Sequence, residues 1–258
     1  MTALRTEHVS KHFGGFEVVR DCSIEVRPSE IVGLIGPNGA GKTTLFNIIS
    51  GALAPDQGEI LVDGTNVTGW RSDRVVRLGL IRTHQIPRPF PKLSVIENCL
   101  VAAPHQTGES IWAVWRRDRR IPQEEAAAEQ VAWSNLHRLK LDRLANEPAS
   151  TLSGGQRKLL ELGRCLMADP SVLLLDEPVA GVTAALADQI GTLIQALRDE
   201  GRTFLIVEHK MDFIMRMCDR VYVMANGAII ANGEPSVIRS DESVLRAYLG
   251  EIDGKQVV

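Results

Sequence analysis

The feature that most constrains this chain is the segment from Ile31 to Leu45. An apolar run, Ile31–Ile35, leads into the pattern GxxxxGK[ST], and a helix-like run with Ile48 and Ile49 follows. This order predicts a strand, a phosphate-binding loop and a helix. A chance glycine-rich turn is the alternative, and the flanking strand and helix argue against it.

The predicted loop has the chemistry of a nucleoside triphosphate site. Glycine takes positive φ without strain, so successive backbone N–H groups can face phosphate oxygens, with the positive end of the helix dipole behind them. Lys42 adds a full positive charge near the β- and γ-phosphates, and the Thr43 hydroxyl is placed to coordinate Mg²⁺. The predicted nucleotide-binding residues here are Gly36, Pro37, Asn38, Gly39, Ala40, Gly41, Lys42, Thr43 and Thr44.

Length and composition fit one sizeable α/β domain. The 258 residues are 44% hydrophobic and 24% charged, and the net charge of −3 argues against a general nucleic-acid binder. We expect no secretory signal, because the first ten residues carry Arg5, Glu7 and His8 and have no long apolar core. We expect no membrane span, since no apolar run approaches 18 residues. The four cysteines lie far apart in apolar runs, so we expect buried free thiols in a reducing compartment, the cytoplasm.

Strands and helices are predicted to segregate along the chain. Leu4–Val9 and Val18–Val26 read as short strands before the phosphate loop. Prolines within Ile86–Pro91 break regular structure, and from Ser94, a plausible N-cap, the pattern is helical. We therefore expect a helical subdomain over 86–150, inserted in the core, and a C-terminal helical tail over 235–258.

Two acidic residues follow a strand that is predicted to be buried. Val172–Leu175 is wholly apolar, as expected inside a parallel sheet, and Asp176 and Glu177 come at its carboxyl end. A carboxylate there needs a partner, so packing alone does not account for the pair. Asp176 can hold Mg²⁺ through water, and Glu177 can orient or deprotonate an attacking water.

Other candidate residues have a structural and a functional interpretation. Gln85 follows a predicted strand, so it is either a ligand-facing amide or a surface residue. His209 comes just after the apolar run Thr203–Val207, where a histidine can reach a γ-phosphate. Phe13 and Phe16 flank a glycine turn, and they either stack on a base or close the edge of the core.

The sequence LSGGQ begins a largely apolar helix. Its serine and glycines at the helix start predict either a second anion site or an ordinary N-cap made by Ser153.

The segment from Trp112 to Arg120 places two tryptophans beside four arginines. That segment either rests at a lipid headgroup boundary or on a membrane partner, or it is a solvated insertion with its tryptophans packed inward.

The ordered set GPNGAGKTT, Gln85, LSGGQ, LLLDEP and His209 resembles the ATP-binding cassette (ABC) ATPases of membrane transporters, from about Leu4 to Ile238. The resemblance implies a single ABC ATPase domain over 1–258. Its expected fold is α/β: a P-loop NTPase core with a mainly parallel sheet, an N-terminal antiparallel β part and a helical subdomain. It also implies that two cassettes, identical or related, close head to tail with ATP between the phosphate loop of one and LSGGQ of the other.

The resemblance also implies a role for each matching residue. Phe13 would stack on adenine, and Gln85 would sense Mg²⁺ and contact the membrane partner. Glu177 would be the catalytic base, and His209 the switch histidine. The expected magnesium residues are Thr43, Gln85 and Asp176, and those expected to contact ATP across the dimer are Ser153, Gly154, Gly155 and Gln156. Thr183 departs from the acidic or amide residue usual at its position, which affects the cross-dimer contact of this loop.

A narrower resemblance concerns the transported molecule. IRTHQIPRPFPKLSVIEN, the helical insertion and the ending AYLG resemble importer subunits for branched-chain amino acids and related amides, although His84 replaces the usual Phe. The implied partners are transmembrane permease subunits and, through them, a substrate-binding protein, with this chain on the cytoplasmic face of the membrane. An exporter ATPase and a soluble, non-transport ABC ATPase are the alternatives.

Overall fold

The structure, a computed structural model, describes residues 2–83, 88–104, 115 and 120–253. The chain divides into two compact units. The first comprises Met1–Gln85, Ser171–Ala180 and Ala187–Val258, and the second comprises Ile86–Pro170 and Gly181–Leu186. The predicted helical subdomain, 86–150, falls within the second unit and stays a prediction as to its bounds.

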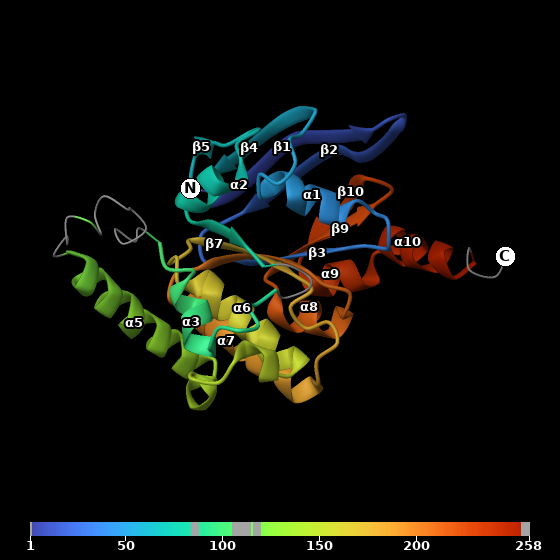
Figure 1. The fold of residues 1–258 in the computed structure, drawn as a ribbon. Helices are drawn as coiled ribbons and strands as arrows, with labels where there is room; N and C mark the ends of the chain where they lie inside the picture. The colour runs from blue at the N-terminus through green and yellow to red at the C-terminus, as the bar shows by residue number, and fades with distance from the viewer. Residues whose placement is uncertain (1, 84–87, 105–114, 116–119, 254–258) are drawn as a thin grey trace. The chain divides into compact units, whose positions relative to one another are not determined.

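The first unit contains two sheets (Figure 1). The four-stranded sheet is antiparallel, in the order β2-β1-β4-β5, with β1 Leu4–Phe13, β2 Phe16–Val26, β4 Gln57–Val62 and β5 Thr65–Asn66. The six-stranded sheet has the order β10-β9-β3-β8-β7-β6, with β3 Ile31–Ile35, β6 Leu80–Arg82, β7 Val172–Asp176, β8 Thr203–Val207, β9 Arg220–Ala225 and β10 Ala228–Gly233. Its neighbours pair in parallel except β9 and β10. The predicted fold class is therefore confirmed.

Burial explains the residue types of the central strands. Every residue of β3, β7 and β8 is buried, since helices or the other sheet cover both faces, and this favours unbroken apolar runs over alternation. Helix α1, Lys42–Ile49, lies between the two sheets (Figure 1). Its apolar side chains share one buried cluster with β1, β2, β4 and the central strands. The helix after the phosphate loop is thereby fixed on both sides.

The remaining helices of this unit are α2 Ser72–Arg77, most of α7 Ala184–Asp199, α8 Met211–Met217, α9 Pro235–Ser240 and α10 Glu242–Asp253. Helix α8 packs on β3 at Gly33. A Cβ atom there would lie 3.1 Å from both the Ile214 side chain and Cys218 Sγ. Glycine at this position thus allows close approach of helix and strand.

The described residues of the second unit are mainly helical, with α3 Val95–Leu100, α5 Arg120–Arg138, α6 Gly154–Leu166 and the short 3₁₀ turns Asp142–Leu144 and Ala149–Thr151. Ser94 caps α3, as predicted. Its hydroxyl accepts from the Glu97 N–H, and the Glu97 carboxylate accepts from the Ser94 N–H at 2.7 Å. This reciprocal capping box marks the start of the helical region after the prolines.

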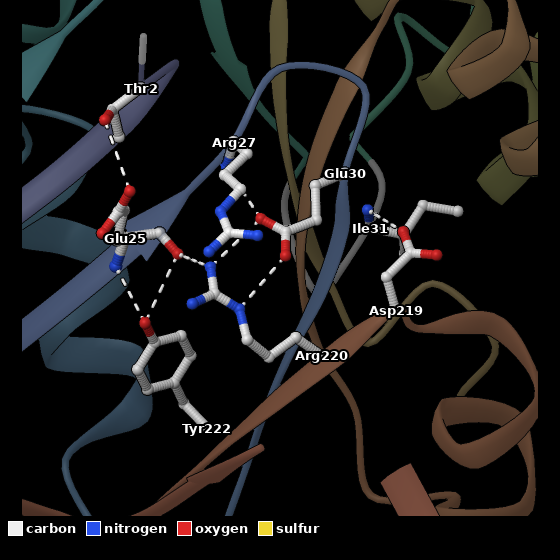
Figure 2. A network of polar contacts seen from close by, with 8 residues as sticks. All are labelled: Thr2, Glu25, Arg27, Glu30, Ile31, Asp219, Arg220 and Tyr222. Atoms are coloured by element: carbon white, nitrogen blue, oxygen red, sulfur yellow. Dashed lines mark hydrogen bonds and ion pairs between the residues drawn. The ribbon is translucent and has the colours of Figure 1, made fainter. Parts of the chain in front are cut away.

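A polar network fixes the start of β3, the strand that leads to the phosphate loop (Figure 2). Arg220, at the start of β9, bonds the Glu30 carboxylate through Nε at 3.1 Å, and that carboxylate also accepts from the Arg27 N–H at 2.7 Å. Asp219 accepts from the Ile31 N–H at 2.8 Å. The loop before β3 is thus held by side chains of a neighbouring strand.

The four cysteines are buried and free, as predicted. Burial raises the pKa of the Cys22 thiol to about 11 and that of Cys99 to about 12. Buried thiols with such pKa values are poor nucleophiles at neutral pH, because the thiolate is the reactive form. These residues therefore act as small apolar side chains.

Candidate functional site

The site lies where the parallel strands of the first unit end. The carboxyl ends of β3, β7 and β8 meet at one edge of the sheet, and each is followed by residues that the sequence singles out. They enclose a pocket of about 310 Å³. Its lining consists of Val18, Asn38, Gly39, Ala40, Gly41, Lys42, Thr43, Thr44, Glu177, Val207 and His209. The predicted phosphate loop, base and histidine therefore share one pocket.

The phosphate loop is shaped by glycines that no other residue can replace without strain. Gly36 has φ 149°, and a Cβ atom there would lie 2.0 Å from the Met224 carbonyl oxygen. Gly41 has φ 101° and would bring a Cβ within 2.5 Å of the Val18 carbonyl oxygen. Both obstacles are backbone atoms, which cannot move aside as a side chain can.

Lys42 is buried and lies within the loop. Its ammonium group donates to the carbonyl oxygens of Gly36, at 2.7 Å, and Pro37, at 2.8 Å. These contacts hold the charge at the centre of the loop, where a phosphate group would bind.

The turn between β9 and β10 supports this loop from behind, a feature that the sequence did not predict. The Gly227 N–H donates to the Ala40 carbonyl at 3.1 Å, and the Gly227 carbonyl accepts from the Arg20 N–H at 2.7 Å. One residue therefore ties the loop to β2. Gly227 has φ 85°, and a Cβ would meet the Val18 carbonyl oxygen at 3.0 Å, so the turn requires glycine.

Glu177 and His209 lie side by side in the pocket. Glu177 Oε1 is 3.1 Å from His209 Nε2. The Glu177 backbone has φ 50°, a left-handed conformation that is unfavourable for this residue type. Such strain persists only where the surroundings impose it, and it is concentrated at functional sites. Here the Glu177 N–H donates to the Val207 carbonyl at 2.8 Å, and its carbonyl accepts from the Ala180 N–H at 3.2 Å.

Asp176 has a partner that sequence reasoning missed. Its Oδ2 is 2.8 Å from Nη2 of Arg82, and the two side chains are only 5% and 12% exposed. The same guanidinium bonds the Asn47 side chain on α1 and lies 5.6 Å from the Phe46 ring centroid. Arg82 thus links the predicted magnesium residue to the helix of the phosphate loop.

The two phenylalanines at the turn between β1 and β2 lie in different settings. Phe13 is about half exposed, and Lys11 Nζ lies 5.9 Å from its ring centroid. Phe16 lines a second pocket of about 430 Å³ together with Glu17, Val18, Arg20, Gly39, Asn226 and Gly227. Phe13 is among the lining residues of neither pocket. The predicted stacking role of Phe13 stays a prediction, and Phe16 is the alternative ring.

In the second unit, Ser153 caps α6. Its hydroxyl accepts from the Gln156 N–H at 3.3 Å, while Gln156 Oε1 accepts from the Ser153 N–H at 2.9 Å. The N-cap interpretation is therefore confirmed, and the predicted anion site at the same helix start stays a prediction. Nothing lies within 4 Å of a Cβ built on Gly154, whereas one on Gly155 would meet the Leu186 side chain at 2.1 Å.

Thr183, which stands where an acidic or amide residue is expected, also caps a helix. Its hydroxyl accepts from the Leu186 N–H at 3.3 Å in the first turn of α7. Thr, Asp and Asn all satisfy a helix start through a side-chain oxygen. The substitution therefore keeps the local cap and removes only the charge or amide.

Two predicted roles, and the unusual His84, concern residues outside the described part of the chain. Gln85 and His84 lie there, and so does most of the segment from Trp112 to Arg120. Within that segment Trp115 is described, and its side chain is exposed. The roles predicted for Gln85 and for this segment stay predictions.

Comparisons with known proteins agree with this site. A family model described as ABC transporter matches residues 19–180. The probable branched-chain amino acid transport ATP-binding protein LivG of Archaeoglobus fulgidus is 40% identical over 255 residues, covering 99% of this chain and 98% of the relative. The high-affinity branched-chain amino acid transport ATP-binding protein LivG of Escherichia coli K12 is 41% identical over 242 residues, covering 93% and 94%.

A solved structure of an ATP-binding cassette has the same fold as this chain. The crystal structure of the ADP conformation of MJ1267, an ATP-binding cassette of an ABC transporter, is 39% identical and superimposes with a TM-score of 0.85. The matched region covers 97% of this chain and 99% of the MJ1267 chain. The similarity thus extends over the phosphate loop, the helical unit and both sheets.

Proposed function

The chain belongs to the ABC transporter family of ATP-hydrolysing proteins, and from this we propose that it powers the import of branched-chain amino acids or related amides. The substrate class is supported by relatives with those names, each at about 40% identity over nearly the whole chain. The observation that carries the catalytic part is the pocket that holds Lys42, Thr43, Glu177 and His209 together.

In the proposed reaction, the phosphate loop and Lys42 hold the β- and γ-phosphates. Glu177 accepts the proton of the water that attacks the γ-phosphate, and His209, 3.1 Å from Glu177, orients this carboxylate and contacts the γ-phosphate. Release of the terminal phosphate then removes the group that His209 and the attacking water contact, while the β-phosphate stays in the loop. In this scheme Glu177 and His209 are the residues that distinguish ATP from ADP.

Magnesium fits the residues present. Thr43 contributes a hydroxyl to the pocket, and Asp176 precedes Glu177 at the end of β7. No group of three or more His, Cys, Asp and Glu side chains suited to a metal occurs among the residues placed by the structure. Few protein ligands are expected for Mg²⁺, which is held mainly by substrate phosphates and water. When bound, the ion would neutralise charge that develops on the phosphate oxygens.

We further propose that two cassettes close on ATP, and that α6 of one chain faces the phosphate loop of the other. Ser153–Gln156 form the N-terminus of this 13-residue helix, where backbone N–H groups and the helix dipole favour an anion. Transmembrane permease subunits, and through them a substrate-binding protein, are the other proposed partners. Among the helices that the structure describes, none has the length and hydrophobicity of a membrane span. The proposed attachment to the cytoplasmic face, through the permeases, rests on the transport relatives.

Uptake of radiolabelled amino acids tests the proposed function. In cells that lack the gene, the wild-type chain is expected to restore leucine, isoleucine, valine or amide uptake, and Glu177→Gln is not. Purification from native membranes in detergent is expected to recover integral membrane subunits with the chain. Export of the labelled compound would instead support an exporter ATPase. Recovery without any membrane subunit would support a non-transport ATPase and contradict the proposal.

Substitution of the two aromatic rings tests which one stacks on adenine. Phe13→Ala is expected to raise the Kd for ATP about 5- to 140-fold, because loss of a base–aromatic stack costs about 1–3 kcal/mol. Phe16→Ala serves as the matched control and is expected to change the Kd less than about twofold. Equilibrium titration with a fluorescent ATP analogue measures both values, and the reverse order of effects would assign the stack to Phe16.

A further inference from the structure

Glu208 is a buried carboxylate at the end of β8, next to the pocket but outside the set of predicted site residues. We propose that Glu208 is a positioning residue for hydrolysis, which fixes the two loops that carry Glu177 and His209. It is only 1% exposed. The inference rests on the roles proposed above for Glu177 and His209.

The contacts of Glu208 are all with backbone N–H groups. Its Oε1 accepts from Val179 at 3.0 Å, and its Oε2 accepts from His209 at 2.7 Å and from Lys210 at 3.0 Å. An ionised carboxylate has two acceptor oxygens and no donor, so it can accept hydrogen bonds from three N–H groups at once. Glutamine, the neutral side chain of the same length, cannot, because one of its two terminal groups is a donor.

These donors belong to two different loops. Val179 lies in the turn that follows Glu177, and His209 and Lys210 lie in the loop between β8 and α8. In this turn the Ala180 N–H donates to the Glu177 carbonyl at 3.2 Å, and Glu177 has the left-handed φ of 50°, which is uncommon for its residue type. Glu208 therefore anchors the strained turn to the histidine loop, through backbone atoms on both sides.

The consequence is a fixed distance between the two proposed catalytic side chains. Glu177 Oε1 and His209 Nε2 are 3.1 Å apart, and each is attached to a loop that the Glu208 carboxylate holds. Misplacing a catalytic group by about 1 Å can cost about 100-fold in rate. The hydrogen bonds of Glu208 go to Val179, His209 and Lys210 and not to the phosphate loop, so binding of ATP is expected to depend on Glu208 much less.

Glu208→Gln is the sharpest variant, because its shape is that of the wild-type side chain. One oxygen becomes an NH₂ group, so in either orientation at least one backbone N–H faces a donor. We expect kcat for ATP hydrolysis to fall about 10- to 100-fold, with KM within about twofold. In the Glu177→Gln background, Glu208→Gln is expected to change turnover less than about threefold, because it acts through a residue already inactivated.

Glu30→Gln is the matched control. The Glu30 carboxylate is also largely buried, with 11% exposure, and it also accepts a hydrogen bond from a backbone N–H, that of Arg27. Glu30 lies just before β3, at the end of this strand opposite to the phosphate loop. We expect it to lower the unfolding temperature as Glu208→Gln does, with kcat unchanged. Equal losses of kcat in both variants would mean that Glu208 has a structural role only, and would overturn the inference.

The remaining outcomes separate the inference from the proposed function. Wild-type turnover in Glu208→Gln, with Glu177→Gln inactive, would overturn the inference and leave the function intact. Full activity of Glu177→Gln would overturn the proposed base and the inference with it. If Glu208→Gln does not fold, amide hydrogen exchange on the wild-type chain decides. Slow exchange at Val179 supports the anchor, and exchange at the rate of an unbonded amide contradicts it.

Discussion

Glu177→Gln is expected to lower the rate of ATP hydrolysis at least about 100-fold and to leave ATP affinity within about twofold. General-base catalysis contributes about 10²–10⁴ to a rate, and glutamine cannot accept the proton of the attacking water. The phosphate loop is unchanged, so the γ-phosphate stays bound and the closed pair of cassettes should accumulate. Phosphate release at saturating ATP gives the rate, and titration with a fluorescent ATP analogue gives the affinity.

Glu59→Gln is the matched control for this variant. Glu59 lies exposed on β4 in the same unit, and its substitution removes the same charge outside the pocket. We expect wild-type turnover. Turnover of Glu177→Gln near that of Glu59→Gln would show that Glu177 is not the base, and the proposed mechanism would then need another group.

Arg82→Ala is expected to lower the free energy of unfolding by about 3–5 kcal/mol. The substitution removes one partner of a buried ion pair and leaves the Asp176 carboxylate, 5% exposed, without its cation. It also removes the contacts of the guanidinium with Asn47 and Phe46. Equilibrium unfolding in urea, followed by circular dichroism, measures the loss.

Arg71→Ala provides the control for this prediction. Arg71 pairs with Asp73 at 3.1 Å, but the two side chains are 87% and 56% exposed. An exposed pair contributes about 0–1 kcal/mol because water and salt screen it. If Arg82→Ala and Arg71→Ala lower the free energy of unfolding by similar amounts, the buried ion pair of Arg82 contributes no more to stability than an exposed pair, and the prediction is wrong.

The phosphate loop and the central strands could be predicted because their residue types follow from local physical requirements. A backbone that wraps a phosphate needs glycine at positions such as Gly36 and Gly41, and strands buried on both faces need apolar runs such as β7. The residues at the carboxyl ends of those strands then meet at one edge. Glu177 and His209 could be placed together for this reason.

Arg82 and Glu208 could not be found in this way. Each acts through a contact between segments far apart in the sequence, 94 residues for Arg82 and Asp176 and 29 residues for Glu208 and Val179. A single arginine or glutamate beside a strand is usually a surface residue, and only the three-dimensional contacts show that these are buried. Thr183 was missed for a different reason: its contact, with the Leu186 N–H, is local, and its capping role depends on where α7 begins.

The central claim is that ATP is held between two cassettes, and one structure tests it most directly. Glu177→Gln, purified with its partner cassette and permeases and saturated with MgATP, is the sample. We predict that Ser153 of this chain lies within hydrogen-bonding distance of the γ-phosphate bound by the phosphate loop of the partner cassette. A bound γ-phosphate that contacts only the cassette whose loop holds it, with Ser153 far from any nucleotide, would contradict the account.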